Sequence, residues 1–160
     1  MAGVHLRGAD IVMRTLKRAG VDTIFTLSGN HIMSLFDAAI DTGHQLIHTR
    51  HEAAAVHMAD AWGRLTGNPG IAMVTGGPGF ANAAAALTSA LGQESPLVLL
   101  AGHTETTQLG RGGFQESRQA EGAAFRSPRR HGLLLRQLRL ALTWPRRFVS
   151  RALADLAQCI

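Results

Sequence analysis

The stretch IAMVTGGPGFANAAAAL, residues 71–87, joins a short apolar run to an alanine-rich segment through a turn that contains three glycines. The apolar run 71–74 is typical of a buried strand, and residues 80–91 have the composition of a helix. The turn 75–79 between them can bring backbone N–H groups close to a ligand. It lacks the Gly-Lys-Ser/Thr ending of a Walker loop, and Asn82 stands where the dinucleotide fingerprint requires glycine. The turn alone therefore indicates a strand-turn-helix unit and leaves the ligand open.

The same alternation of short apolar runs and helical patterns continues on both sides of this unit. We predict further strands at 23–27, 45–48 and 96–101, and further helices at 9–19, 32–40 and 51–65. Short strands that are apolar throughout are typical of a parallel sheet with helices on both faces, which makes the fold α/β. Ligands of such sheets lie beyond the carboxyl ends of the strands. We therefore expect the glycine-bearing turns and the start of the helix at 51–65 to converge there.

Charge is distributed unevenly along the 160 residues. The formal net charge is +5, but residues 1–124 hold eight Lys or Arg against ten Asp or Glu, whereas residues 125–160 hold eight Arg against Asp155. A nucleic-acid partner would have to bind this tail alone, with a steep salt dependence, and we do not expect one. No apolar run reaches the roughly 20 residues of a membrane span, and residues 1–10 do not resemble a secretory signal. The single Cys159 fits a reducing compartment, so we expect a cytoplasmic protein.

Glu52 is the first candidate for chemistry, because it begins a predicted helix directly after a predicted strand. The helix dipole and the free N–H groups of the first turn stabilise a carboxylate at this position. The same helix presents a face of small residues that permits close approach by another helix, which would shield Glu52 from water: Val56, Ala59 and Gly63. Catalytic carboxylates are often shielded in this way. Spacing alone nevertheless favours an ordinary exposed glutamate in a first helical turn.

Four histidines lie close together in the sequence: His44, His48, His51 and His57. The His51-Glu52 pair begins a zinc-protease pattern, but the second histidine of that pattern would stand at position 55, which is Ala55. We therefore expect hydrogen-bonded or solvated histidines and no metal site.

Phe114 and Gln115 follow the long loop after the fourth predicted strand. They could begin a helix with polar surface residues. Alternatively they could form a wall over the site at the sheet edge, since glutamine can hydrogen-bond a ligand and phenylalanine can pack on it. The local sequence leaves both interpretations open.

Six segments, in this order, resemble the N-terminal domain of the acetolactate synthase-like family of thiamine-diphosphate enzymes: GADIVMRTLKRAGVDTIF, LSGNHIMSLFDA, HTRHEAAAVHMADAWGRLTG, VTGGPGFANAAAAL, SPLVLLAG and FQES. Pyruvate oxidase and benzoylformate decarboxylase belong to the same family. The resemblance covers about residues 6–121. It implies a pyrimidine-binding domain at 1–122, followed by an atypical Arg-rich tail at 123–160 that is foreign to the family or poorly ordered.

The resemblance also implies a role for Glu52. In the family, the matching glutamate hydrogen-bonds N1′ of the cofactor's aminopyrimidine ring and favours the imino tautomer, which then removes the proton from C2 of the thiazolium ring. Phe114 and Gln115 match a substrate-side pair. Ser28 departs from the proline that is usual in its turn. The residues that match cofactor-binding positions are Ser28, Gly29, Asn30, Glu52, Thr75, Pro78, Gly79 and Asn82.

The family binds the diphosphate and its Mg²⁺ on a second domain that carries Gly-Asp-Gly, a motif absent from these 160 residues. The resemblance therefore implies half of a shared site, which requires a diphosphate-binding domain or subunit in a homo- or hetero-oligomer and is inactive alone. The implied reaction is that of a lyase or transferase acting on 2-keto acids. A separate alpha subunit of a split-chain decarboxylase is one alternative, and a non-catalytic fragment that dimerises through the small-residue face is another. We favour a truncated or frame-shifted remnant, because the composition changes near Ala123.

Overall fold

The structure is a computed structural model that describes residues 6–124, 133–135 and 138–143. Its strands are β1 (Thr23–Thr26), β2 (Gln45–His48), β3 (Gly70–Val74), β4 (Leu97–Ala101), β5 (Leu133–Leu135) and β6 (Leu138–Thr143). Its helices are α1 (Gly8–Arg18), α2 (Met33–Asp41), α3 (Glu52–Thr66), α4 (Pro78–Gly92) and α5 (Gln119–Ala124), with two 3-10 turns, η1 (Asn30–Ile32) and η2 (Thr106–Gln108). Within the described residues, no helix is long and apolar enough to cross a membrane.

The strands form one sheet in the order β2-β1-β3-β4-β6-β5. The first four run parallel, so that Phe25 of β1 stands opposite Ile47 on one side and Ala72 on the other. This confirms the predicted α/β fold with its parallel sheet and its four strands. Because all four strands point the same way, the segments that follow them lie at one edge of the sheet.

Two strands that the sequence did not predict extend the sheet beyond β4. β6 pairs antiparallel with β4, and β5 pairs antiparallel with β6. Part of the predicted Arg-rich tail thus adds to the sheet of the domain. The predicted division at residue 122 stays a prediction, and the possible helix at 148–157 lies outside the described residues.

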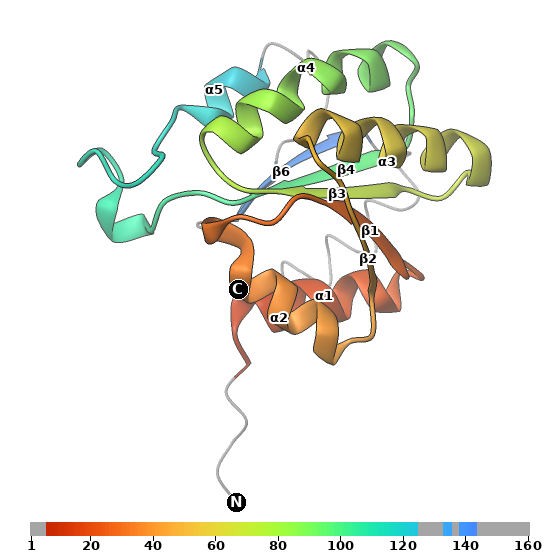
Figure 1. Cartoon of the computed structure of the whole chain (residues 1–160), viewed down its shortest axis with the longest axis horizontal. Coiled ribbons are helices and arrows are strands. Elements are labelled where there is room, and N and C mark those ends of the chain that lie inside the picture. Colours follow the sequence, from red (N-terminus) through yellow and green to blue (C-terminus); the bar gives the residue numbers. More distant parts are fainter. Residues whose placement is uncertain (1–5, 125–132, 136–137, 144–160) are drawn as a thin grey trace, which may run out of the picture.

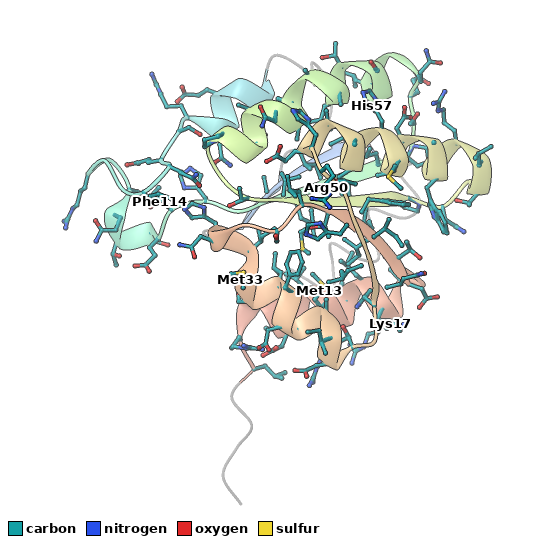
Figure 2. All side chains as sticks on the ribbon, viewed as in Figure 1. Met13, Lys17, Met33, Arg50, His57 and Phe114 are labelled. Carbon is teal, nitrogen blue, oxygen red and sulfur yellow. The ribbon has the colours of Figure 1, made fainter. Side chains whose placement is uncertain are left out.

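Helices cover both faces of the sheet, with α1 and α2 on one face and α3, α4 and α5 on the other (Figure 1). Alternate side chains of β3 enter the two layers: Ile71 and Met73 pack with α1 and α2, whereas Ala72 and Val74 pack with α3 and α4. Met13 of α1, labelled in Figure 2, is fully buried in the first of these layers. All four β3 side chains are completely buried, as expected for a strand covered on both sides.

The small-residue face of α3 is covered inside the domain. Val56 and Ala59 are fully buried in one cluster with the alanines of α4. A Cβ at Gly63 would collide with the backbone carbonyl of Pro96, so the helix approaches the start of β4 more closely than any other residue would allow. The expectation of a close helix neighbour is met by α4. The alternative that this face dimerises with another chain is wrong, because the domain itself occupies it.

Candidate functional site at the carboxyl edge of the sheet

Glu52 is the first residue of α3 and is only 8% exposed. The helix begins here because His51 has an extended backbone, and its Nδ1 accepts a hydrogen bond from the Ala53 N–H at 3.1 Å. The Thr49 hydroxyl donates to the Thr26 carbonyl, which ties the segment before the helix to the end of β1. The alternative of an ordinary exposed glutamate is therefore wrong, and the carboxylate is held at the sheet edge.

Glu52 meets two residues of α4, which begins after the neighbouring strand β3. The Asn82 side-chain amide donates to Glu52 Oε2 at 2.9 Å. A Cβ built on Gly79 would lie 3.3 Å from Glu52 Oε1 and 2.6 Å from Thr75 Cγ2. Among the described residues, Oε1 has no hydrogen-bond partner. Because Gly79 has no side chain and Asn82 is itself exposed, this oxygen can be approached by a ligand.

The glycine turn after β3 holds two further predicted residues, Thr75 and Pro78. The Thr75 hydroxyl lies 3.1 Å from His31 Nδ1, and its side chain fills the space that a Cβ on Gly29 would need. Pro78 is exposed and is the first residue of α4, where its missing N–H costs nothing. The structure therefore packs Gly29 against Thr75 and Thr75 against Gly79, and Gly79 lies beside Glu52.

Ser28 and Asn30 flank Gly29, and the structure shows no contact of either residue with Glu52 among the described residues. Both residues are exposed. The Ser28 hydroxyl lies 3.3 Å from His48 Nε2, at the end of β2, and Asn30 begins the 3-10 turn η1. Their predicted contact with a cofactor stays a prediction.

His31 is a residue of this site that the sequence did not single out. Its Nδ1 contacts the Thr75 hydroxyl, its Nε2 lies 3.1 Å from the Phe114 carbonyl oxygen, and its ring stacks on that of Phe114 at 5.8 Å. It therefore joins the segments that follow β1, β3 and β4. Its place directly after a glycine turn at a strand end was the one signal in the sequence.

Phe114 and Gln115 lie in the loop after β4, which extends beyond the sheet edge (Figure 2). The Phe114 side chain is 65% exposed apart from its stacking on His31. Gln115 has a positive φ of 54°, and its carbonyl faces the Cα of Gly77. The helix-start interpretation of these two residues is thus wrong, because α5 begins only at Gln119. They lie beside the glycine turn, as the wall interpretation requires.

The side chain of Glu116 holds the tip of the same loop through hydrogen bonds to its backbone. Its carboxylate accepts backbone N–H hydrogen bonds from Gly110, Gly112 and Gly113 at 2.6, 3.0 and 3.2 Å. These bonds hold the pKa of Glu116 below its ordinary value. Beside the loop lies an open pocket of about 650 Å³, whose lining includes His103, Gln115, Glu116 and Arg118. Glu52 does not line this pocket.

The four histidines are separated in the structure. His48 contacts Ser28, His51 caps α3, and His57 is exposed on α3, while buried His44 lies 2.6 Å from the Thr42 hydroxyl. Across residues 6–124, no three His, Cys, Asp or Glu side chains are grouped so that they could hold a metal ion.

Most of the chain matches a known protein family. Residues 6–122 match the family described as "Thiamine pyrophosphate enzyme, N-terminal TPP binding domain". An acetolactate synthase large subunit of Mycobacterium tuberculosis is 42% identical over 106 residues, which are 66% of this chain and 19% of that protein. A 2-hydroxyacyl-CoA lyase 2 of Danio rerio is 43% identical over 109 residues, 68% of this chain and 18% of the lyase.

An acetolactate synthase isozyme 3 large subunit of Escherichia coli is 41% identical over 114 residues, 69% of this chain and 20% of that subunit. The chain thus spans about a fifth of the length of these relatives. The family match covers well over half of the chain and includes every residue assigned above to the site. The chain belongs to the thiamine pyrophosphate enzymes, and residues 6–122 are their N-terminal TPP-binding domain.

Proposed function

We propose that this domain binds the aminopyrimidine ring of thiamine diphosphate (thiamine pyrophosphate) at the carboxyl edge of the sheet, with Glu52 as the catalytic carboxylate. The observation that carries the proposal is the position of Glu52, buried between the amide of Asn82 and the bare Cα of Gly79. A flat heterocycle with a weakly basic nitrogen fits such a place, because Gly79 leaves room beside the one carboxylate oxygen that lacks a partner. Burial of a carboxylate oxygen without a hydrogen-bond donor is costly, and a ligand that donates to Oε1 would remove that cost.

Asn82 determines which oxygen of Glu52 is available. Its N–H donates to Oε2 and orients the carboxylate, so that Oε1 is left to hold a proton shared with a ring nitrogen. Gly29 and Thr75 form the adjoining wall, and Ser28, Asn30 and Pro78 complete the proposed cofactor-binding set. The bound cofactor would supply the carbanion chemistry itself. Phe114 and Gln115 would contact the substrate.

The proposed reaction is that of a lyase or transferase on 2-keto acids, in line with the acetolactate synthases and acyl-CoA lyases among the relatives. The diphosphate and Mg²⁺ would bind a diphosphate-binding domain that lies outside these 160 residues. We propose a homo- or hetero-oligomer in which that domain comes from a partner, including the case of a split-chain decarboxylase. The cytoplasm stays the expected location.

Titration of the ¹⁵N-labelled chain with thiamine diphosphate tests the proposed site. We expect resonance shifts at Gly79 and at the Asn82 side chain, and weaker binding by about tenfold or more in Glu52→Gln, because a hydrogen bond to an ionised group contributes about 1.5–3 kcal/mol. Glu94→Gln, at an exposed glutamate just beyond the far end of α4, is the matched control and should bind as the wild type does. Equal affinity of the wild type and Glu52→Gln would contradict the proposal.

A turnover assay tests the proposed dependence on a partner. The purified chain with thiamine diphosphate, Mg²⁺ and pyruvate should release no carbon dioxide above the rate without protein. Full decarboxylase activity of the chain by itself would contradict the half-site.

A further inference from the structure

Gln119, the first residue of α5, has a buried side chain whose two ends bind two different loops of the site edge. The residue is 3% exposed. Its Oε1 accepts the backbone N–H of Gly77 at 2.8 Å, and its Nε2 donates to the backbone carbonyl of Gly102 at 3.0 Å. Gly77 follows β3 and Gly102 follows β4. One side-chain amide therefore joins the ends of two neighbouring strands.

The hydrogen bond from Gly77 to Gln119 lies at the start of α4, where backbone N–H groups lack partners. Gly77 precedes the first residue of α4 and has a φ of 59°, a left-handed conformation that favours glycine. The N–H groups at a helix start have no partner within the helix. The N–H of Gly77 is one of these groups, and the Gln119 oxygen accepts its hydrogen bond. The bond thus holds the backbone directly before the first residue of α4.

The start of α4 determines the surroundings of Glu52. Gly79 is two residues beyond Gly77, and its Cα passes close to Glu52 Oε1. Asn82, one helical turn further, donates to Glu52 Oε2. A shift of the Gly77 backbone would move both residues relative to the carboxylate, because they belong to the same first turns of one helix.

We infer that Gln119 is a positioning residue of this site: its amide fixes the glycine turn after β3 against the end of β4, and so sets the distance of Gly79 and Asn82 from Glu52. It touches neither Glu52 nor the space beside Gly79, and it acts through the Gly77 backbone. The inference rests on the proposed function of that site, since only a ligand held there requires this positioning.

Two substitutions of Gln119 distinguish the roles of its two hydrogen bonds. Gln119→Met keeps a side chain of similar length but removes both hydrogen bonds. Gln119→Glu keeps an oxygen for the Gly77 N–H and replaces the donor to Gly102 by an oxygen that repels its carbonyl. Gln93→Met, at an exposed glutamine at the far end of α4, is the matched control.

Native-state hydrogen exchange of the full chain gives the first readout. We expect the Gly77 amide to exchange at least tenfold faster in Gln119→Met, while the amide of buried Met73 in β3 is unchanged. Gln119→Glu should retain most of the Gly77 protection, and Gln93→Met all of it. A uniform loss of protection across the domain, or an unchanged Gly77 in Gln119→Met, would overturn the inference.

Titration with thiamine diphosphate gives the second readout. Binding should weaken severalfold in Gln119→Met, in parallel with the lost Gly77 protection, and remain unchanged in Gln93→Met. Lost protection with unaltered affinity would overturn the positioning role while the proposed function stands. If the wild type shows no shifts at Gly79 and Asn82 at millimolar cofactor, the proposed function fails, and the inference that depends on it fails as well.

Discussion

Replacing Gly79 by alanine should crowd Thr75 and Glu52 and lower the free energy of unfolding. The added Cβ would lie 2.6 Å from the Thr75 methyl carbon and 3.3 Å from Glu52 Oε1. Carbon atoms in good contact are about 3.5–4.0 Å apart, so the Thr75 side chain must move by about 1 Å. Overpacking of this kind costs about 1–3 kcal/mol. The better helix propensity of alanine returns about 1 kcal/mol, which leaves a net loss of about 0–2 kcal/mol.

Gly92→Ala is the matched control, because Gly92 is the last residue of the same helix and a Cβ there meets nothing within 4 Å. This variant should gain about 0.5–1 kcal/mol from helix propensity alone. Urea unfolding followed by far-UV circular dichroism should therefore separate the two variants by about 1–3 kcal/mol. Only Gly79→Ala should also bind thiamine diphosphate more weakly. Equal stabilities and equal affinities would refute the close approach of Gly79 to Glu52.

Three further changes test other contacts. Asn82→Ala should lower the free energy of unfolding by about 1.5–3 kcal/mol, because it leaves the buried carboxylate of Glu52 without its donor. In a urea titration, the control Asn68→Ala, at an exposed residue, should be as stable as the wild type. Equal stabilities of the two variants would contradict the hydrogen bond between Asn82 and Glu52. Glu116 has a lowered pKa, so its hold on the 110–113 loop should be lost as the pH falls from about 4.5 through its folded value. Exchange of the Gly110 amide measures this, and Glu116→Gln should abolish the pH dependence. Burial lowers the pKa of His44, so the unfolded chain binds more protons below about 6.5 and stability should fall there. Thermal unfolding at pH 8 and pH 5.5 should show a smaller difference in His44→Asn.

Most of the fold could be predicted from the sequence because its four parallel strands are short, apolar and bounded by glycines. The sequence also predicted that the start of the Glu52 helix and the glycine turn after β3 meet at one edge, but not the hydrogen bond between Asn82 and Glu52. The two residues are 30 positions apart in the sequence. Each lies near the start of a helix that follows a parallel strand, and the carboxyl ends of parallel strands lie at one edge of the sheet. Chain order and topology were sufficient to place the two segments at the same edge of the sheet.

The rest of the site depends on contacts that leave no local pattern. His31 meets Thr75 and Phe114 across 44 and 83 residues, and Gln119 meets Gly77 across 42. A polar residue in a turn or at a helix start has the same sequence signature whether it is exposed or bridges two loops. The pairing of β6 with β4 was missed although the sequence of β6, LRLALT, alternates leucine with other residues. The pattern was overlooked because the Leu- and Arg-rich stretch around it was assigned to an atypical tail outside the domain.

A crystal structure of the chain grown with thiamine diphosphate would show where the cofactor lies relative to Glu52. We expect the aminopyrimidine ring beside Gly79, with a ring nitrogen within about 3 Å of a carboxylate oxygen of Glu52. A ring bound elsewhere, for instance in the pocket beside His103 and Arg118, or a Glu52 side chain turned into open solvent, would contradict the proposal.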